Sequence, residues 1–380
     1  MYIPSYKEEP FEWYKEMRSE NPIVRSGNAV YLFKNNDIVK ILSDYRNFSS
    51  QFRDLLGSEM INLMNTKTSP SILILDPPRH TELRNLVSDA FTPMIINSYE
   101  DKIRKIASDL VDNIRKNDRV DIVNELSTPL PIAVISEMLG VPEKDFSLLK
   151  EWSDKLATSL GREPDIKTQY EMADYFYQMI DRKHNRDNII SRLSSVELDG
   201  KKLTDQDIAG FSILLLVAGN ETTTNLITNM ILSISENMDI YNNIIKNPSI
   251  ISSVVEETLR FRSPVQSTRR YSKIDTEING IPVYKNDFLV LYLGSANRDE
   301  DIYKKPEVFD PYREHKRHIA FGNGIHFCLG APLARLEARI AIEELSRKVR
   351  SFEIENPSPD NRLDSDIMYG FNKLYMKIHD

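Results

Sequence analysis

The sequence of 380 residues has one cysteine, few glycines (13) and no long hydrophobic run. A single cysteine excludes an internal disulfide and any zinc or iron–sulfur site built from several cysteines. The most apolar stretch, 213–218, is far too short to cross a membrane. The first residues do not combine a basic segment with an apolar one, as a signal peptide does. We therefore expect a cytoplasmic protein that does not bind membranes.

Basic charge is also in deficit, with 49 Lys and Arg against 57 Asp and Glu, a net charge of −8. This balance argues against a dedicated nucleic-acid-binding protein. No Gly-x-Gly-x-x-Gly segment occurs, so the sequence predicts no nucleotide or flavin site of that kind. Hydrophobic residues at 41% and charged residues at 28% allow a sizeable core and exclude disorder of the whole chain.

Helical periodicity dominates what the sequence does contain. Apolar residues at helical spacing, together with capping and breaking residues, predict helices over 101–116, 127–139, 146–160, 168–183, 251–261 and 329–349. Short strand patterns occur over 24–33, 277–284 and 288–293. The sequence predicts an irregular segment over about 296–324. The prediction is a mainly α protein with a small β portion, folded as a single large domain over 1–380.

One further helix is predicted over about 204–237, and its centre breaks the rules of a good helix. The segment Ala218-Gly219-Asn220-Glu221-Thr222 places glycine, threonine and a carboxylate after an apolar span. Glycine and threonine are poor helix formers, and burying a carboxylate is costly. Such local conflicts mark functional sites. A solvent-exposed polar turn is the alternative interpretation.

The one cysteine, Cys328, lies in the segment Phe-Gly-Asn-Gly-Ile-His-Phe-Cys-Leu-Gly, residues 321–330. Its glycines permit a tight loop, and Pro332 fits the first turn of the helix that follows. A cysteine at a helix N-terminus is favoured as a thiolate, which can act as a nucleophile, a redox thiol or a metal ligand. A buried, inert cysteine is the alternative.

This segment resembles, without a departure, the heme-binding loop Phe-Gly-x-Gly-x-His-x-Cys-x-Gly of the cytochrome P450 family. From average usage such as Gly at about 7%, the six fixed positions arise by chance on the order of once in a million chains. The resemblance implies the cytochrome P450 fold, with the long helix crossing heme b. It also implies that Cys328 is the axial ligand of the heme iron, in agreement with thiolate ligation in that family.

Other segments resemble further marks of the family. Residues 218–222 are similar to its oxygen-activating segment, which implies catalytic roles for Thr222, in holding oxygen, and Glu221, in relaying protons. The resemblance likewise implies that Ala218 and Gly219 lie over the heme. Glu257 and Arg260 match the family's structural ion pair. The same spacing at Glu314–Arg317 and Glu344–Arg347 is interpreted as surface charge.

Several side chains resemble the groups that bind the heme propionates in this family. They are His80, Arg84, Thr268, Arg270 and His326. Histidine and arginine suit carboxylates as hydrogen-bonding or cationic partners. Gly330, two residues after the cysteine, lets another group approach the backbone closely.

The implied activity is that of a heme-thiolate monooxygenase, which inserts one atom of O₂ into a C–H or C=C bond of a small apolar organic substrate. Leu214, Leu215 and the stretch 63–73 are expected to line the substrate pocket, under a lid formed by 146–183. Electrons must come from a separate ferredoxin-type or flavin redox partner. The basic run 315–318 is a candidate docking site for that partner.

Three alternatives remain at this stage. A peroxide-driven heme-thiolate peroxygenase would use the same cysteine loop, although such enzymes usually lack an acid–alcohol pair. A non-catalytic heme-binding protein would sense or carry a gas. A helical protein with a reactive thiol would need no cofactor.

Overall fold

The computed structural model describes residues 9–51, 63, 66–158, 165–181, 188–314 and 317–379. The chain forms two compact units, each assembled from separate segments. The first unit comprises Met1–Ser49, Ile103–Pro129 and Thr222–Asp380, and the second comprises Ser50–Lys102 and Leu130–Glu221. Helix α11 (Asp205–Ser235) contributes to both. The prediction of a single domain over 1–380 stays a prediction.

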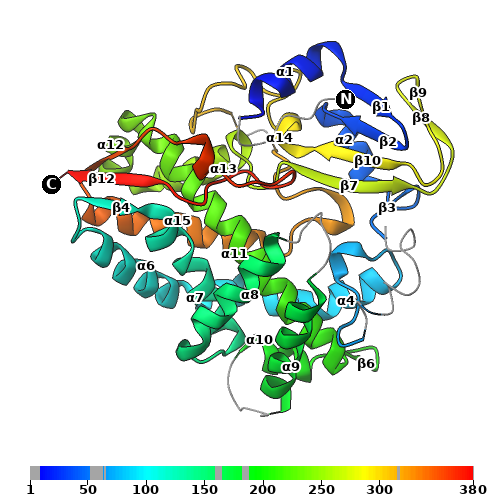
Figure 1. The fold of residues 1–380 in the computed structure, drawn as a ribbon, viewed down its shortest axis with the longest axis horizontal. Helices are drawn as coiled ribbons and strands as arrows, with labels where there is room; N and C mark the ends of the chain where they lie inside the picture. The colour runs from blue at the N-terminus through cyan, green and yellow to red at the C-terminus, as the bar shows by residue number, and fades with distance from the viewer. Residues whose placement is uncertain are drawn as a thin grey trace. The chain divides into compact units, whose positions relative to one another are not determined.

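The first unit contains a five-stranded sheet in the order β1-β2-β10-β7-β3 (Figure 1). Its strands are β1 (Ile23–Ser26), β2 (Ala29–Leu32), β3 (Phe48–Ser49), β7 (Ser267–Ser272) and β10 (Phe288–Tyr292). Strand β10 pairs in parallel with β2 and antiparallel with β7. The sheet therefore joins the N-terminal part of the chain to the segment that precedes the cysteine.

Two of the predicted strands are in fact hairpins. Residues 24–33 form β1 and β2, because Gly27 adopts a positive φ of 62° and turns the chain. Residues 277–284 form β8 (Thr276–Ile278) and β9 (Ile281–Val283), turned at Asn279 and Gly280, both with positive φ. An Asn-Gly pair between apolar residues is a strong hairpin signal, which the single-strand interpretation overlooked.

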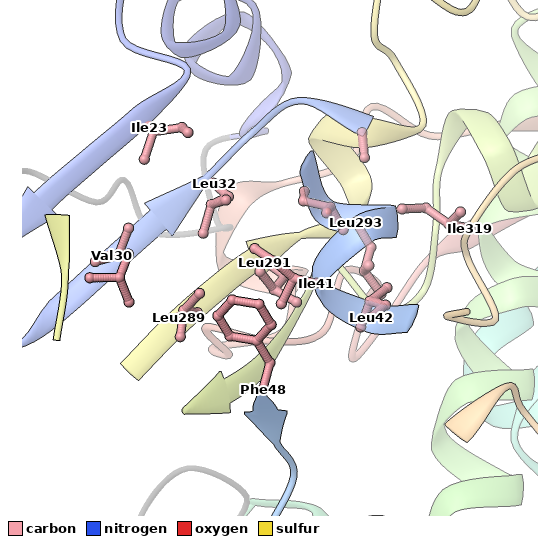
Figure 2. Packing of buried hydrophobic residues seen from close by; sticks show 13 residues of the cluster. Ile23, Val30, Leu32, Ile41, Leu42, Phe48, Leu289, Leu291, Leu293 and Ile319 are labelled. Carbon is pink, nitrogen blue, oxygen red and sulfur yellow. The ribbon is translucent and has the colours of Figure 1, made fainter. Parts of the chain in front are cut away.

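A hydrophobic cluster packs on this sheet (Figure 2). It joins side chains of β2 and β10 to helix α2 (Asn35–Ser43) and to Ile319, which lies shortly before the cysteine. The fully buried side chains include Leu32, Leu289 and Leu291. Alternation along the strands puts these residues on one face, and α2 covers that face with Ile38, Ile41 and Leu42.

The rest of the first unit is mainly helical. Its helices are α1 (Phe11–Glu20), most of α6 (Glu100–Ile114), α12 (Met238–Lys246), α13 (Ile251–Phe261), α14 (Leu293–Ala296) and α15 (Ala331–Lys348). A second sheet has the order β11-β12-β4, made from Ser351–Ile354, Tyr375–His379 and Arg119–Asp121. Helix α15 packs against α13 and α12. Short helical turns occur at Val123–Ser127, Pro248–Ile250, Gly324–His326 and Pro359–Asn361.

The second unit is helical apart from one short hairpin, among the residues described. Its helices are α4 (Arg79–Ser88), α5 (Pro93–Ser98), α7 (Pro129–Leu139), α8 (Phe146–Thr158), α9 (Ile166–Asp181), α10 (Ile189–Ser195) and the first part of α11. Strands β5 (Glu197–Leu198) and β6 (Lys201–Lys202) pair before α11 begins. Short 3₁₀ turns occur at Ile72–Ile74, Asp89–Phe91 and Glu143–Asp145.

The mainly α class with a small β portion is confirmed. The helix predicted over 251–261 coincides with α13, and those over 101–116, 127–139, 146–160, 168–183 and 329–349 correspond to α6, α7, α8, α9 and α15. In the part of the chain that the structure describes, no helix is both long enough and apolar enough to span a membrane. Helices α1, α2, α5, α10, α12 and α14 were not predicted.

Candidate functional site

The cysteine loop, defined as residues 321–330, is closed by a hydrogen bond across it. The backbone N–H of Cys328 donates to the carbonyl oxygen of Phe321 at 3.0 Å. Gly322 and Gly324 both have φ of +73°, a conformation that costs glycine little. Gly330 is the N-cap of α15. Cys328 thus lies beside a helix N-terminus, as predicted, where the helix dipole favours a thiolate.

Helix α2 anchors this loop to the core of the first unit. A Cβ atom on Gly324 would collide with the carbonyl oxygen of Leu42, so the loop backbone lies directly on the end of α2. Asn323 Nδ2 donates to Ser43 Oγ at 2.7 Å beside that contact. Leu42 is itself a member of the buried cluster in Figure 2. The loop is therefore attached to rigid structure.

Apolar side chains of the cysteine loop are left half-buried. Ile325, Phe327 and Leu329 are each partly exposed, as is Cys328. A Cβ atom built on Gly330 would meet no heavy atom of the described residues within 4 Å. Exposed apolar surface is unfavourable in water. A flat apolar group that binds a thiolate and covers these side chains fits this surface.

Glu257 and Arg260 form the predicted ion pair on α13. Arg260 donates to both carboxylate oxygens of Glu257 at 2.7 and 2.8 Å, and both side chains are almost fully buried. Arg260 also donates to the carbonyl oxygens of Asn297, Pro306 and Val308. These bonds fix the irregular segment 296–324 against α13. Sequence reasoning missed the third partner, Arg313, whose Nε lies 3.0 Å from Glu257.

The interpretation of Glu344–Arg347 as surface charge is wrong for Glu344, whereas Glu314 and Arg317 are exposed as predicted. Glu344 is 1% exposed and pairs with Arg104 at 3.0 Å and Arg347 at 2.9 Å. Glu344 is one of several buried residues of α15, which include Ile340 and Ala341. In the basic run 315–318, residues 315 and 316 lie outside the described residues. His318 is held by Glu256, Nε2 to Oε2 at 3.1 Å, so only Arg317 of the described part is exposed.

Strand β7 carries two of the predicted propionate-binding residues. Arg270 is 8% exposed, and its Nη1 donates to the carbonyl oxygen of Arg269 at 2.7 Å. Thr268 is partly exposed and opposes Leu291 in the register with β10. His326 ends the 3₁₀ turn Gly324–His326 and is partly exposed. The roles of these three side chains toward heme stay predictions.

One stripe of helix α11 is open, although most of the helix is buried. Leu214, Leu215, Glu221 and Thr222 are partly exposed and Ala218 is exposed, whereas every residue from Thr223 to Ile234 is buried. Positions 215, 218 and 222 recur at helical spacing and share one face. The helix continues without a break through the segment that the sequence marks as unfavourable. The stripe therefore contains apolar side chains together with the carboxyl group of Glu221 and the hydroxyl group of Thr222.

The two residues between Ala218 and Glu221 face neighbouring helices of the second unit. A Cβ atom on Gly219 would approach Ile135 of α7 to 3.1 Å, tighter than ordinary contact. Asn220 is 1% exposed and donates to Ser153 of α8 at 3.2 Å. Glycine at 219 therefore has a packing reason within the second unit, and its place over the heme stays a prediction.

His80 and Arg84 lie one turn apart on α4 in the second unit. His80 is 2% exposed. Burial lowers the pKa of His80, and the positive charge of Arg84 lowers it further, against a smaller opposing effect of Asp76. A neutral imidazole is therefore favoured at position 80. It would serve a carboxylate as a hydrogen-bond donor, with Arg84 as the cation.

The expected substrate walls are partly described. Leu214 lines a small cavity of about 20 Å³ with Ser69, Ile72 and Phe211. Of the stretch 63–73, residues 64 and 65 lie outside the described residues, as do 159–164 and 182–183 of the lid. Gly210 packs on the carbonyl oxygen of Ser69, where an added Cβ would come to 3.2 Å. The segment at 69–72 thus contacts the helix that bears the stripe.

The residues fit heme better than a bare metal ion. Among the described residues, no group of three His, Cys, Asp or Glu side chains could hold a metal ion by itself. One thiol beside a half-buried apolar loop instead suits a metal that arrives with its own planar ligand. The open stripe of α11 adds apolar side chains together with Glu221 and Thr222, whose roles stay predictions.

Comparison with known proteins identifies the chain. A family model described as Cytochrome P450 matches residues 127–376. A putative cytochrome P450, YjiB, from Bacillus subtilis is 38% identical, covering 97% of this chain and 94% of its own length. Cytochrome P450 119 from Sulfurisphaera tokodaii is 36% identical over 97% of this chain and 99% of its own.

Solved structures similar to this chain belong to the same family. CYP109E1 from Bacillus megaterium, in complex with testosterone, has a TM-score of 0.88 at 37% identity, covering 98% of this chain and 100% of its own. The polyketide synthase cytochrome P450 PksS from Bacillus subtilis has a TM-score of 0.92 at 32% identity, covering 99% and 98%. The chain therefore belongs to the cytochrome P450 family of heme-iron monooxygenases.

Proposed function

We propose that this protein is a heme-thiolate monooxygenase in which Cys328 is the axial ligand of heme b. The observation that carries this is the cysteine loop, closed by the Cys328–Phe321 hydrogen bond and leading into α15. By their resemblance to the family's propionate-binding groups, His80, Arg84, Arg270 and His326 would bind the heme propionates. Thr268 would be a companion of Arg270, and Gly330 would let the heme approach the backbone closely.

When bound, heme iron activates dioxygen so that one oxygen atom enters a C–H or C=C bond of the substrate. The side chains of the protein would position the oxygen substrate and supply protons to it. Thr222 Oγ1 would hydrogen-bond to the oxygen substrate, and the Glu221 carboxylate would carry protons toward it. The partial exposure of Glu221 supports proton exchange with solvent. Ala218 and Gly219 would leave room above the heme plane.

We further propose that the substrate is a small apolar organic molecule lying against Leu214 and Leu215. The apolar part of the open α11 stripe supports this, since ligand pockets are mostly lined by hydrophobic side chains. The testosterone complex of CYP109E1 indicates a hydrophobic, polycyclic compound as the first class to test. Spin-state shifts of the Soret band on adding such compounds would identify binders.

Electrons would come from a separate ferredoxin-type or flavin redox partner. Membership of the cytochrome P450 family supports the need for a redox partner. Exposed Arg317, shortly before the cysteine loop, is a candidate contact for an acidic partner. The cytoplasmic location stays a prediction.

Turnover with isotopically labelled dioxygen tests the proposed activity. The heme-loaded protein would be supplied with NADH, a surrogate ferredoxin system and a compound that shifts its spin state. Monooxygenation predicts one labelled atom in each molecule of hydroxylated product. Product formed only with added peroxide would indicate a peroxygenase, and binding without any product would indicate a non-catalytic heme protein.

A further inference from the structure

A half-buried ion pair beside the cysteine loop has no part in the mechanism described so far. Glu256 lies on α13 and Arg335 on α15. Arg335 donates through Nε and Nη2 to the two carboxylate oxygens at 2.6 and 2.9 Å. Their side chains are 28% and 35% exposed and line an open cavity of about 480 Å³ in the first unit. A bidentate fork fixes the guanidinium in one plane.

His318 is a second hydrogen-bonding partner of Glu256. The N–H of Ala320 donates to His318 Nδ1 at 3.3 Å, so Nε2 carries the proton that points toward Glu256 at 3.1 Å. Burial alone would raise the pKa of Glu256, but hydrogen bonds from Arg335 and His318 lower it to about 2. The carboxylate is therefore ionised throughout the neutral range, and its partners keep their geometry.

The fixed guanidinium contacts the first residue of the cysteine loop. The central carbon of Arg335 lies 4.6 Å from the ring centroid of Phe321, within the range of a cation–π interaction. The His318 ring is 6.0 Å from the same ring. The carbonyl oxygen of Phe321 accepts the hydrogen bond from the N–H of Cys328. Arg335 thus contacts Phe321, and Phe321 is in turn hydrogen-bonded to Cys328.

The loop needs such a constraint at this end. Gly322 and Gly324 have no side chain to restrict the backbone, and ordering flexible residues costs conformational entropy. At the middle of the loop, α2 supplies contacts through Leu42 and Ser43. At Phe321, the first residue of the loop, the contact with Arg335 restricts the chain in the same way.

We propose that Arg335, held by Glu256, is a positioning residue for the Cys328 thiolate and acts through Phe321. This inference rests on the proposed role of Cys328 as heme ligand. Arg335 fixes the Phe321 ring, and with it the carbonyl that orients the Cys328 backbone. The orientation of the Cys328 side chain would thereby be maintained. Partners beyond the ligand itself are worth about 10–100-fold in metal affinity or activity.

The test measures how long the thiolate bond survives, without turnover. Heme-loaded wild type, Arg335→Gln, Arg335→Lys and Glu256→Gln are reduced with dithionite under carbon monoxide. The decay of the red-shifted Soret band to the ordinary position is then followed. We expect decay about 10–100-fold faster in Arg335→Gln and Glu256→Gln. Arg335→Lys keeps the charge but lacks the planar fork, so it should also decay faster than wild type.

Two comparisons separate positioning from a general loss of stability. Arg347→Gln removes an exposed ion-pair partner on the same helix and should leave the decay unchanged. Phe321→Leu should decay as fast as Arg335→Gln, and the double variant no faster, because both act on one contact. Unchanged decay in Arg335→Gln, or additive effects in the double variant, would overturn the inference.

The outcome is distinguishable from failure of the heme assignment. A wild-type protein without the red-shifted band would contradict the role of Cys328 itself. A wild-type band with variants that decay at the wild-type rate would contradict only the role of Arg335. If Arg335→Gln does not retain heme, the decay rate of the red-shifted band in Arg335→Lys tests the inference instead. A decay rate equal to that of the wild type would overturn it.

Discussion

At the scale of the residue, the three consecutive threonines of α11 have different environments. Thr223 and Thr224 are buried, and Thr224 donates to the carbonyl oxygen of Ser127 at 3.1 Å. Thr222 is partly exposed on the same stripe as Ala218. Only the first of the three therefore has both a hydroxyl and an open surface. This distinction cannot be read from the run of identical letters.

Removing the Thr222 hydroxyl should uncouple electron use from product formation. In Thr222→Ala we expect product per NADH to fall about tenfold, with peroxide rising to match, because positioned proton transfer is worth about 100-fold or more and water replaces part of it. Product, peroxide and NADH are measured together. Thr223→Ala, a buried neighbour, is the control. Equal coupling in both variants would remove Thr222 from the proposed role.

Glu337 of α15 gives a second prediction at this scale. It is 1% exposed, and burial raises its pKa well above the ordinary value of 4.5. The folded protein keeps this proton while the unfolded chain loses it above pH 4.5. Stability is therefore full below that pH and falls as the pH rises toward the folded pKa.

The variant Glu337→Gln should remove that loss. Urea unfolding at several pH values above 4.5 should show a smaller loss of stability with rising pH than in the wild type. Glu353→Gln, an exposed acid on β11, should leave the profile unchanged. A parallel profile for Glu337→Gln would mean that the folded protein already holds this group ionised.

At the scale of the element, α13 organises a long irregular segment. Arg260 donates to three carbonyl oxygens there, at Asn297, Pro306 and Val308. Asp310 donates its N–H to Glu257 at 2.8 Å. Carbonyls without a regular partner are costly when buried. The ion pair of α13 therefore takes the place of secondary structure for the segment that leads to the cysteine loop.

Breaking this pair should destabilise the protein strongly. In Glu257→Ala, Arg260 stays buried without its carboxylate, and we expect a loss of about 3–5 kcal/mol in the free energy of unfolding. Urea unfolding of the heme-loaded protein measures it. Arg115→Ala removes one partner of an ion pair with Asp112 in which the two side chains are 52% and 50% exposed, and it should change stability by about 0.5 kcal/mol or less. A loss in Glu257→Ala no larger than in this control would contradict the account.

The same elements show how far the sequence could be interpreted. Helix α13 and the ion pair within it were predictable because spacing along one helix decides both. Arg313, Glu256 and Arg335 were missed as a set, since their partners lie 56 and 79 positions away and no local pattern joins them. Gly27 and Asn279-Gly280 carried a hairpin signal in the sequence that the strand interpretation ignored.

At the scale of the whole molecule, the net charge of −8 coexists with local positive charge near the cysteine loop. Arg317 is exposed, and its Nη2 donates to Asn323 at 3.2 Å. Two acidic proteins would repel each other at long range unless such a patch faces the partner. The proposed redox partner therefore needs a complementary acidic surface.

Reversing this charge should slow electron transfer from an acidic partner. For Arg317→Glu we expect about tenfold slower reduction by an acidic ferredoxin at low salt, with the difference shrinking at high salt because ions screen exposed charges. Stopped-flow reduction under carbon monoxide measures the rate. Lys377→Glu on β12 makes the same change of charge as a control. Equal rates in both variants would exclude Arg317 as a contact.

The central claim is that Cys328 binds heme iron as a thiolate, and one spectrum tests it most directly. The heme-loaded protein is reduced with dithionite and exposed to carbon monoxide. Ligation of the iron by the Cys328 thiolate predicts the characteristic red-shifted Soret band, and its loss in Cys328→His. A band at the ordinary position in the wild-type protein, or no heme band after heme is supplied, would contradict it.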